Sequence, residues 1–357
     1  MLLSELNPGQ RFLLFLGKNW VVFFLLFLCV LFSFTGTGFL SPKTLNNILI
    51  TSSPALLLAA GETFVIITGG IDLSVGFVRG LISVISAIIM RDLYAAGYSP
   101  YVAILWGIVV GIGIGLLPGL VNGILVAKFR VPPFIATFGM YGIAYGVSEI
   151  LCNSVPIAGL PALAGFIGNG YLLYYLPGQS FTWFSPPQGI AREEIRSLIP
   201  LFPNVFMLSL LAILVFAFIL SRTPFGQHTY AIGGNIDAAR RAGIPVDRHL
   251  IKVYMISSFF ASLSGVLATL IFSIGAPTQF SSSLELFAVA AVVIGGASLM
   301  GGKGSMSGTF LGVLVLSILE IGFLMSGILP FYRYVAVGVT LIAAVLVDQS
   351  FPELVYD

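Results

Sequence analysis

Residues 221–252 read SRTPFGQHTYAIGGNIDAARRAGIPVDRHLIK and form the one long polar and basic stretch in a chain that is otherwise largely apolar. The central part of this stretch predicts a short helix, with residues suited to start it and to end it. Asn235 or Asp237 is suited to cap the first turn by accepting a hydrogen bond from a free backbone N–H. Gly243 is suited to the left-handed conformation that ends a helix, and Pro245 prevents the helix from resuming.

The helix predicted in this stretch is about two turns long, and a helix of that length is not stable alone in water. It therefore needs a surface to rest on. Composition alone leaves two interpretations open. The stretch is either a solvated loop whose positive charges orient the protein, or a docking helix for a soluble partner.

The composition on either side of this stretch is that of a membrane protein. Of the 357 residues, 58% are hydrophobic and 8% are charged, whereas a soluble domain has about 25% charged residues. We therefore predict a polytopic membrane protein with a single transmembrane domain over residues 1–357. The net charge of +2 gives no indication of a nucleic-acid partner. Cys29 and Cys152 fall in or at apolar segments and indicate neither a disulfide framework nor a metal site.

Ten apolar segments are long enough to cross the bilayer as helices, at about 20 residues each. The first is expected to be retained, because residues 33–38 lack an Ala-type signal cleavage site. The predicted fold class is therefore all-α. The expected spans are 19–39, 46–69, 75–92, 101–127, 133–152, 203–221, 250–272, 284–299, 305–325 and 331–348.

An even number of spans places both termini on one side, and the distribution of Lys and Arg indicates which side it is. One face carries Arg11, Lys18, Lys128, Arg130, Arg222, Arg240, Arg241, Arg248, Lys252 and Lys303; the other carries Lys43, Arg91, Arg192, Arg196 and Arg333. The more basic face is predicted to be cytoplasmic. Both termini and the loop 222–249 then lie in the cytoplasm, and the long connection 153–200 is an extracytoplasmic insert.

Glycines recur every four residues along the fourth predicted span, at Gly107, Gly111, Gly115, Gly119 and Gly123. This spacing forms a ridge of small residues on one helix face, where another backbone can approach closely. Helix packing is the expected role of the ridge, and a substrate path along its groove is the alternative.

A break interrupts the apolar sequence between the second and third spans, at residues 68–76. Gly69 and Gly70 end one helix, and Asp72 and Ser74 are both suited to cap the next. Such a break belongs either at the cytoplasmic surface or where the backbone lines a polar cavity. The sequence does not distinguish these positions, and a simple tight turn is a third interpretation.

The sequence of this break, FVIITGGIDLSVG at Phe64–Gly76, closely resembles the signature of the monosaccharide branch of ABC importer permeases, the ribose, galactose, xylose and autoinducer-2 type. Asp237–Gly243, DAARRAG, looks like the Glu-Ala-Ala-x-x-x-Gly coupling loop of ABC permeases, with Asp in place of Glu. Further matches follow in the same order: NG at 122–123, PPFIAT at 132–137, TPFG at 223–226, AIGGN at 231–235 and LFAVAAVVIGGASL at 286–299. The resemblance runs from about residue 45 to the end, except for the insert 153–200, which is shorter in the family.

The resemblance implies a permease subunit in the bacterial inner membrane. Its partners would be a second permease subunit, identical or homologous, two ATP-binding domains or subunits, and an extracytoplasmic solute-binding protein. ATP and Mg²⁺ would be bound by the ATPase partner, and this chain would hold no cofactor or metal. The residues implied in ATPase coupling are Asn235, Asp237, Ala238, Ala239, Arg240, Arg241 and Gly243. The face formed by Ala238 and Ala239 is expected to pack into the partner's groove.

Charged residues within spans are costly and are therefore candidates for function. Glu62 and Arg79 lie at similar distances from the break on antiparallel neighbouring spans, so we predict that they form an ion pair. The alternative is that Arg79 extends to the interface while Glu62 faces a wet cavity. The candidate residues of the pathway or gate are Glu62, Gly69, Gly70, Asp72, Ser74, Arg79 and Asn122.

The sequence holds no constellation of catalytic residues. Only two histidines are present, both in the polar stretch, and no HExxH, GxSxG or Cys/His cluster occurs. The segment GGKG at 301–304 is not a phosphate-binding loop, since Ala297 and Gly304 occupy positions that require Gly and Ser or Thr. An ion-gradient-driven transporter or channel is the alternative function. The sugar, the choice of homodimer or heterodimer, and the role of the insert are left open.

Overall fold

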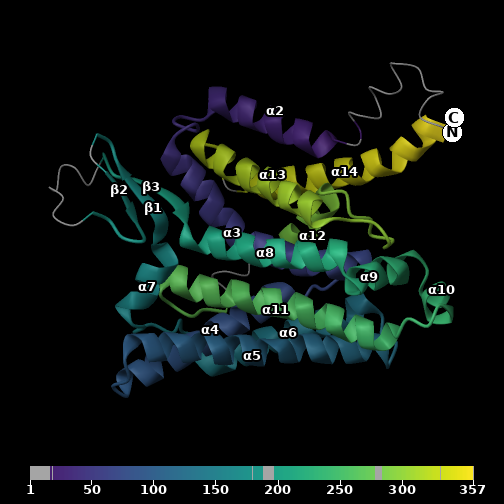
Figure 1. Ribbon diagram of the computed structural model, residues 1–357, viewed down its shortest axis with the longest axis horizontal. Coiled ribbons are helices and arrows are strands. Elements are labelled where there is room, and N and C mark those ends of the chain that lie inside the picture. Colours follow the sequence, from purple (N-terminus) through teal and green to yellow (C-terminus); the bar gives the residue numbers. More distant parts are fainter. Residues whose placement is uncertain are drawn as a thin grey trace.

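The computed structural model describes residue 17 and residues 19–178, 180–187, 197–277, 284–329 and 331–356. The elements run along an elongated bundle of helices with a small sheet at one end (Figure 1). In chain order they are α2 (Trp20–Thr35), α3 (Pro42–Ile67), α4 (Val75–Ala95), α5 (Pro100–Ala127), α6 (Pro133–Cys152), α7 (Ala162–Asn169), β1 (Tyr171–Leu176), β2 (Ser180–Trp183), β3 (Ile199–Pro203), α8 (Asn204–Arg222), α9 (Pro224–Gly234), α10 (Ile236–Arg241), α11 (Val246–Phe272), α12 (Leu284–Ile294), α13 (Met306–Met325) and α14 (Tyr332–Tyr356).

Several long helices begin at a serine that is directly readable in the sequence. The side chains of Ser41, Ser99 and Ser305 accept hydrogen bonds from backbone N–H groups three residues later, at the starts of α3, α5 and α13. Proline occupies the first turn of α3 and α5, where its missing N–H would have no helical partner. Local chemistry therefore fixes where these apolar runs start.

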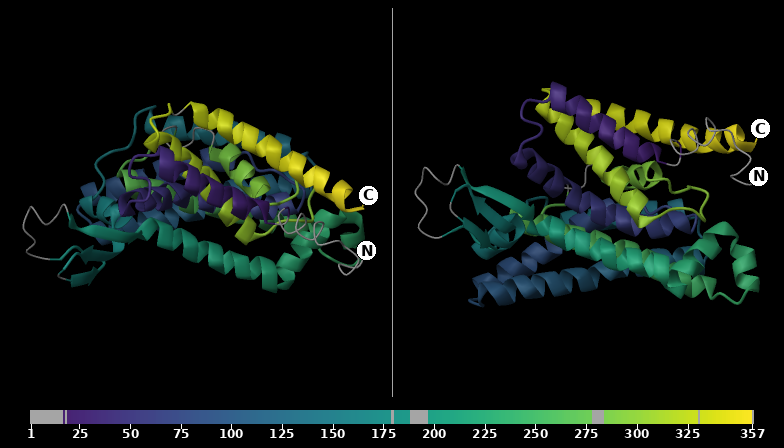
Figure 2. Two further views of the ribbon diagram at one scale, coloured as in Figure 1. Left: turned by 90° about the horizontal axis from the view of Figure 1, so that it is seen from above. Right: turned by 45° about the horizontal axis from the view of Figure 1, so that its top comes forward.

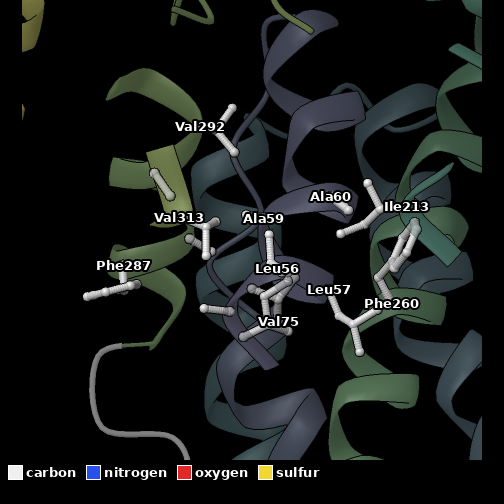
Figure 3. Close-up of a cluster of buried hydrophobic side chains, with 14 of the residues drawn as sticks. Leu56, Leu57, Ala59, Ala60, Val75, Ile213, Phe260, Phe287, Val292 and Val313 are labelled. Carbon is white, nitrogen blue, oxygen red and sulfur yellow. The ribbon is translucent and has the colours of Figure 1, made fainter. Parts of the chain in front are cut away.

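Helix α3 lies at the centre of the bundle and contacts α8, α11, α12 and α13. Leu56, Leu57 and Ala59 on α3 have no exposed surface, and they pack against residues such as Phe260 of α11 and Val292 of α12 (Figure 3). Most of the length of α3 thus contacts protein rather than lipid.

The outer helices show the opposite pattern. Large apolar side chains such as Phe27 of α2, Ile143 of α6 and Phe218 of α8 are more than half exposed. An apolar surface of this extent belongs in a bilayer. The protein is therefore a multi-pass membrane protein, as its composition predicts.

Helices occupy all ten segments that were predicted as spans. Six of those in the described part of the chain are long and apolar enough to cross a membrane, namely α3, α5, α6, α8, α11 and α13. The apolar helices α2 and α12 are shorter, and α4 carries Arg79, Arg91 and Asp92.

The two ends of the bundle differ in structure. The α10 end, so named here, carries the turn 68–74, α9, α10 and the end of α14, whereas the sheet end carries α7 and the strands (Figures 1 and 2). All described basic residues assigned above to the predicted cytoplasmic face lie on segments at the α10 end. The sequence-based sorting of charge thus corresponds to the two physical ends of the molecule.

The predicted all-α class is wrong for the insert 153–200. The strands form an antiparallel sheet in the order β2-β1-β3, with Leu173 opposite both Trp183 and Leu201. Strand β1 reads YLLYYL, and aromatic residues favour strands. Counting apolar residues by span length could not detect strands of four to six residues, because a short apolar run is compatible with either structure.

Candidate functional site

The polar stretch at the α10 end contains two helices rather than the one predicted. Helix α9 follows α8 directly, and α10 follows α9 after Asn235. The Asn235 side chain accepts a hydrogen bond from the backbone N–H of Ala238 at 2.9 Å, so Asn235 rather than Asp237 caps α10. Gly243 has φ +82°, the left-handed conformation that favours glycine at a helix end.

The predicted outward face of α10 needs correction. Ala239 is buried in this chain's own cluster with Ile232, Val246 and Leu250, so it is not available to a partner. Ala238 is exposed, and the two alanines therefore point in different directions. The reason is geometric, because neighbouring helical residues are separated by about 100° around the axis.

The charged residues of α10 also differ from one another. Arg240 forms an ion pair with Asp247 at 3.0 Å, so part of its charge is engaged within the loop. Asp237, Arg241 and Ala242 are exposed, and neither Asp237 nor Arg241 forms an ion pair within the described residues. The part of α10 that is exposed and forms no ion pair within the described residues therefore includes Asp237, Ala238 and Arg241.

Helix α9 fixes α10 to the membrane part of the chain. Tyr230 donates a hydrogen bond to the carbonyl oxygen of Gly304 at 2.8 Å, and the Gly302 N–H donates to the Ile67 carbonyl at 2.8 Å. Burial raises the pKa of the Tyr230 hydroxyl, so the group remains a donor at neutral pH. These contacts place α9 against the loop before α13, and that loop is bonded in turn to the end of α3.

The backbone of α9 also lies very close to the end of α3 and to the loop before α13. A Cβ added to Gly233 would overlap the Ile67 carbonyl oxygen and lie 2.5 Å from the Gly302 nitrogen. Only glycine fits there. The neighbouring Gly234 has nothing within 4 Å of the corresponding position.

A cavity of about 350 Å³ separates α10 from the turn 68–74. It is lined by Gly69 and Gly70 on one side and by Ile236 and Arg240 of α10 on the other, with Tyr254 of α11 also at its wall. The break in the sequence and the coupling loop, predicted as separate features, thus share one space.

The same turn also takes part in a fully buried polar network. Asp72 accepts hydrogen bonds from the Ser74 N–H at 3.0 Å, from the Ser74 hydroxyl at 2.5 Å and from the Ser257 hydroxyl at 2.8 Å. The Asp72 N–H donates to Glu62 Oε1 at 2.9 Å, and Asn122 Nδ2 donates to Ser74 Oγ at 3.1 Å. The structure therefore brings four of the predicted pathway residues together.

The predicted ion pair between Glu62 and Arg79 is not formed. Glu62 is bonded to the turn, and its second carboxylate oxygen has no hydrogen-bond partner. Arg79 donates from Nε to Ser264 of α11 at 3.1 Å. Both residues are buried, so Arg79 also does not extend to a solvated interface. The prediction assumed that the two helices are antiparallel neighbours, but α11 packs against both α3 and α4 and separates them.

Arg79 instead lines a second cavity, of about 250 Å³, in the part of the bundle toward the sheet end. Arg333 of α14 and Glu320 of α13 form an ion pair at its wall. Arg79 is therefore not part of the Glu62–Asp72 network.

The glycine ridge of α5 packs against α4 and α11, and all five glycines are buried. Cβ atoms there would meet Met90 at Gly107, Ser86 at Gly111, Ser262 at Gly115, Tyr254 and Ser258 at Gly119, and Ile251 at Gly123. The ridge thus allows three helices to approach closely, next to Asn122 and the polar network.

Sequence reasoning missed the contribution of α11 to this region. Ser257 binds Asp72 and Ser264 binds Arg79, and the Tyr254 hydroxyl is buried at the cavity. The available signal was the recurrence of serine within an apolar span, at 257, 258, 262 and 264. In the described residues, His, Cys, Asp and Glu form no group of three that could hold a metal ion.

Comparison with known proteins adds the following. Residues 44–345 match a family model described as "Branched-chain amino acid transport system / permease component". The chain is 35% identical to the ribose import permease protein RbsC of Bacillus subtilis over 328 residues, 91% of each chain. It is 32% identical to the galactose/methyl galactoside import permease protein MglC of Haemophilus influenzae over 355 residues, 97% of this chain and 98% of the relative.

A third relative is the fructose import permease protein FrcC of Rhizobium meliloti. It is 33% identical over 316 residues, which cover 88% of this chain and 80% of the relative. No solved structure matches the chain.

Proposed function

Because this chain belongs to the family of branched-chain amino acid transport system permease components, we propose that it forms the membrane pathway of an ATP-driven importer for a monosaccharide. It is the permease component, and ATP hydrolysis resides in a separate subunit. The chain itself therefore needs neither ATP nor Mg²⁺ as a bound cofactor. Family membership also removes the basis for the alternative of an ion-gradient-driven carrier.

The substrate class rests on the relatives. Three similar permeases with high coverage are named for ribose, for galactose and methyl galactoside, and for fructose. All of these are monosaccharides or close derivatives, although the family model is described for branched-chain amino acids. A small neutral sugar is therefore the substrate class that this chain is proposed to carry.

The proposed coupling contact is the exposed surface of α10, formed by Asp237, Ala238 and Arg241. The observation that carries this proposal is the anchoring of α9, because a partner that moves α10 also moves the ends of α3 and the loop before α13. Two ATP-binding domains or subunits would each engage one permease subunit there. A change of nucleotide state would then shift the permease between its outward and inward forms.

The gate is proposed to lie at the Glu62–Asp72 network. The turn 68–74, which carries Asp72 of this network, also contributes Gly69 and Gly70 to the cavity that α10 lines, so displacement of α10 would act on the turn first. Gly69 and Gly70 give that turn the backbone freedom to move. Arg79 would act separately, at the cavity toward the sheet end.

The proposed topology has ten crossings, both termini and the loop 222–249 in the cytoplasm, and the insert 153–200 outside. One permease domain would span residues 1–357. A solute-binding protein would approach from the sheet end, where the strands β1, β2 and β3 of the insert lie (Figure 1).

The deciding experiment measures uptake of labelled ribose, galactose and fructose in cells that contain the permease with or without its ATPase subunit. Uptake should require the ATPase and should persist when proton and sodium gradients are collapsed while ATP is maintained. Full uptake without the ATPase would reject the proposed coupling, and transport of leucine in place of all three sugars would reject the substrate class.

A further inference from the structure

An apolar groove runs along the outside of the bundle toward the α10 end, between α5, α8, α9 and α11. It has a volume of about 400 Å³ and is lined by Leu116, Ile219, Phe225, Met255, Ile256 and Phe259, with Lys252 at its end. The six apolar residues are half-buried, so the groove opens on the surface that faces lipid. None of the residues of the Glu62–Asp72 network lines it.

Along one face of α11, the residues beside this groove change from apolar to basic. Phe259, Ile256 and Met255 give an apolar stripe, and the same face continues through Lys252 to Arg248 with spacings of three and four residues. From Phe259 to Lys252 the rise is about 10 Å, whereas one leaflet of the hydrocarbon core is about 15 Å deep. The groove therefore has the depth needed for much of one acyl chain.

The α8 side supplies a second basic residue at the same end. Phe218 and Arg222 share a face of α8, and Phe218 is 63% exposed on the lipid side. Arg222 lies between Ile219 and Phe225, which both line the groove. Within the part of the chain that the structure describes, Arg222, Arg248 and Lys252 belong to none of the ion pairs. A positive charge is thus available where the apolar groove meets water.

A second groove offers a comparison. It lies between α4 and α5 near the sheet end, has a volume of about 520 Å³ and is also mostly apolar. Its charged residue is Asp92, which pairs with Arg91 at 2.7 Å. Apolar surface therefore occurs near both ends of the bundle, but unpaired basic charge accompanies only the groove near α10 among these two.

We propose that the groove between α5, α8, α9 and α11 binds an anionic phospholipid from the leaflet at the α10 end. One acyl chain occupies the apolar part, and the phosphate lies between Lys252 and Arg222, with Arg248 one turn further from the membrane. Basic groups beside a lipid-facing apolar groove are the chemistry that selects anionic over zwitterionic headgroups. Because α9 forms one wall, the bound lipid would brace the helix that carries α10.

The test uses the purified full-length chain after removal of native lipid. Phosphatidylglycerol or phosphatidylcholine with identical acyl chains is added, and bound lipid is counted by native mass spectrometry while thermal unfolding is followed in parallel. Phosphatidylglycerol should bind more tightly. Each neutralised basic residue should reduce that preference about 5-fold, so Lys252→Gln reduces it about 5-fold and the Lys252→Gln, Arg222→Gln double variant about 30-fold.

Two further variants separate headgroup from chain recognition. Lys303→Gln is the matched control, because Lys303 is exposed at the same end and does not line the groove; it should keep the full preference. Met255→Trp fills the groove and should weaken both lipids alike. Free inorganic phosphate and phosphatidylglycerol with six-carbon chains should bind far more weakly than the long-chain lipid.

Equal binding of the two lipids, or an unchanged preference in the double variant, would overturn the proposal. A change in oligomeric mass with Met255→Trp, at constant lipid count, would show that the groove is an interface with a second copy of the chain. If Lys303→Gln lowered the preference for phosphatidylglycerol as much as Lys252→Gln does, the preference would reflect the general positive charge of this end and not the groove. That result would also overturn the proposal.

Discussion

At the scale of single residues, the junction between α9 and the membrane part depends on the absence of a side chain. Gly233 lies against the Ile67 carbonyl and the Gly302 nitrogen, and the Gly302 N–H bonds to Ile67 across the same contact. Separate segments of the chain therefore meet at one point through backbone atoms alone.

Gly233→Ala should separate α9 from the end of α3, because a backbone obstacle cannot rotate away as a flexible side chain can. We expect a loss of about 1–3 kcal/mol of stability from overpacking, together with loss of sugar uptake. Gly234→Ala, in the adjacent open position, should be close to neutral. Thermal unfolding of both variants, with uptake at matched membrane levels, measures the difference; equal behaviour of the two would contradict this account.

The sequence predicted where individual residues lie better than it predicted which residues they contact. Gly243 was expected at the end of α10 because its left-handed conformation is a local property. The pairing of Glu62 with Arg79 follows from linear distance on two neighbouring spans, and it is wrong because α11 lies between α3 and α4. Ser257 and Ser264 supply the observed contacts, from a helix far away in the chain.

At the scale of elements, periodicity was the most informative signal. The four-residue repeat of glycines indicated that α5 would be approached closely on one face, and α4 and α11 lie there. Apolar length predicted where helices lie but missed β1, β2 and β3. Apolar length also does not indicate α9, because the polar sequence of this helix resembles a loop leading into α10.

Gly119→Ala should weaken the packing of α5 on α11. Its Cβ would meet the Tyr254 backbone and lie 2.6 Å from Ser258 Cβ, so we expect about 1–3 kcal/mol of destabilisation. Gly113 lies on the same helix, and nothing lies within 4 Å of its added Cβ. Gly113→Ala is therefore the control, and it should leave the unfolding temperature unchanged or slightly raised. Similar losses in both variants would refute the packing role of the ridge.

Arg241→Glu tests the exposed surface of α10 without changing a buried side chain. The residue is exposed, so the fold should be retained. Reversal of charge at a docking surface is expected to weaken the ATPase contact by 1 kcal/mol or more, about 5-fold or greater. Co-purification of the ATPase and ATP-dependent uptake should both fall. Lys43→Glu, an exposed basic residue near the sheet end, should leave both at the level of the unmodified protein, and a fall there would point to a general charge effect.

At the scale of the whole molecule, charge and structure divide the protein in the same way. The described basic residues gather mainly at the α10 end, and the sheet lies at the other (Figures 1 and 2). Composition predicted a membrane protein because 8% charged residues cannot cover a soluble surface. The assembly with other subunits could be inferred only from family resemblance, since neither composition nor periodicity identifies a partner.

Single cysteines at the two ends would establish the orientation of the bundle. In a background without Cys29 and Cys152, Ala242→Cys and Ser185→Cys are both at exposed positions. A membrane-impermeant maleimide applied to intact cells stripped of the outer membrane should label position 185 and spare 242, and inverted vesicles should give the reverse. Labelling of both positions from one side would contradict the crossing by α8, which separates them.

The burial of α3 has a consequence for the synthesis of the protein. The Asp72 carboxylate that follows this helix is satisfied partly by Ser257, 185 residues later. At about 5–20 residues per second, the ribosome needs about 10–40 s to produce that donor. During this interval α3 exists without α11, α12 and α13, three of the helices that bury it in the folded protein. We therefore expect α3 to need temporary shelter by the insertion machinery until the second half of the polypeptide arrives.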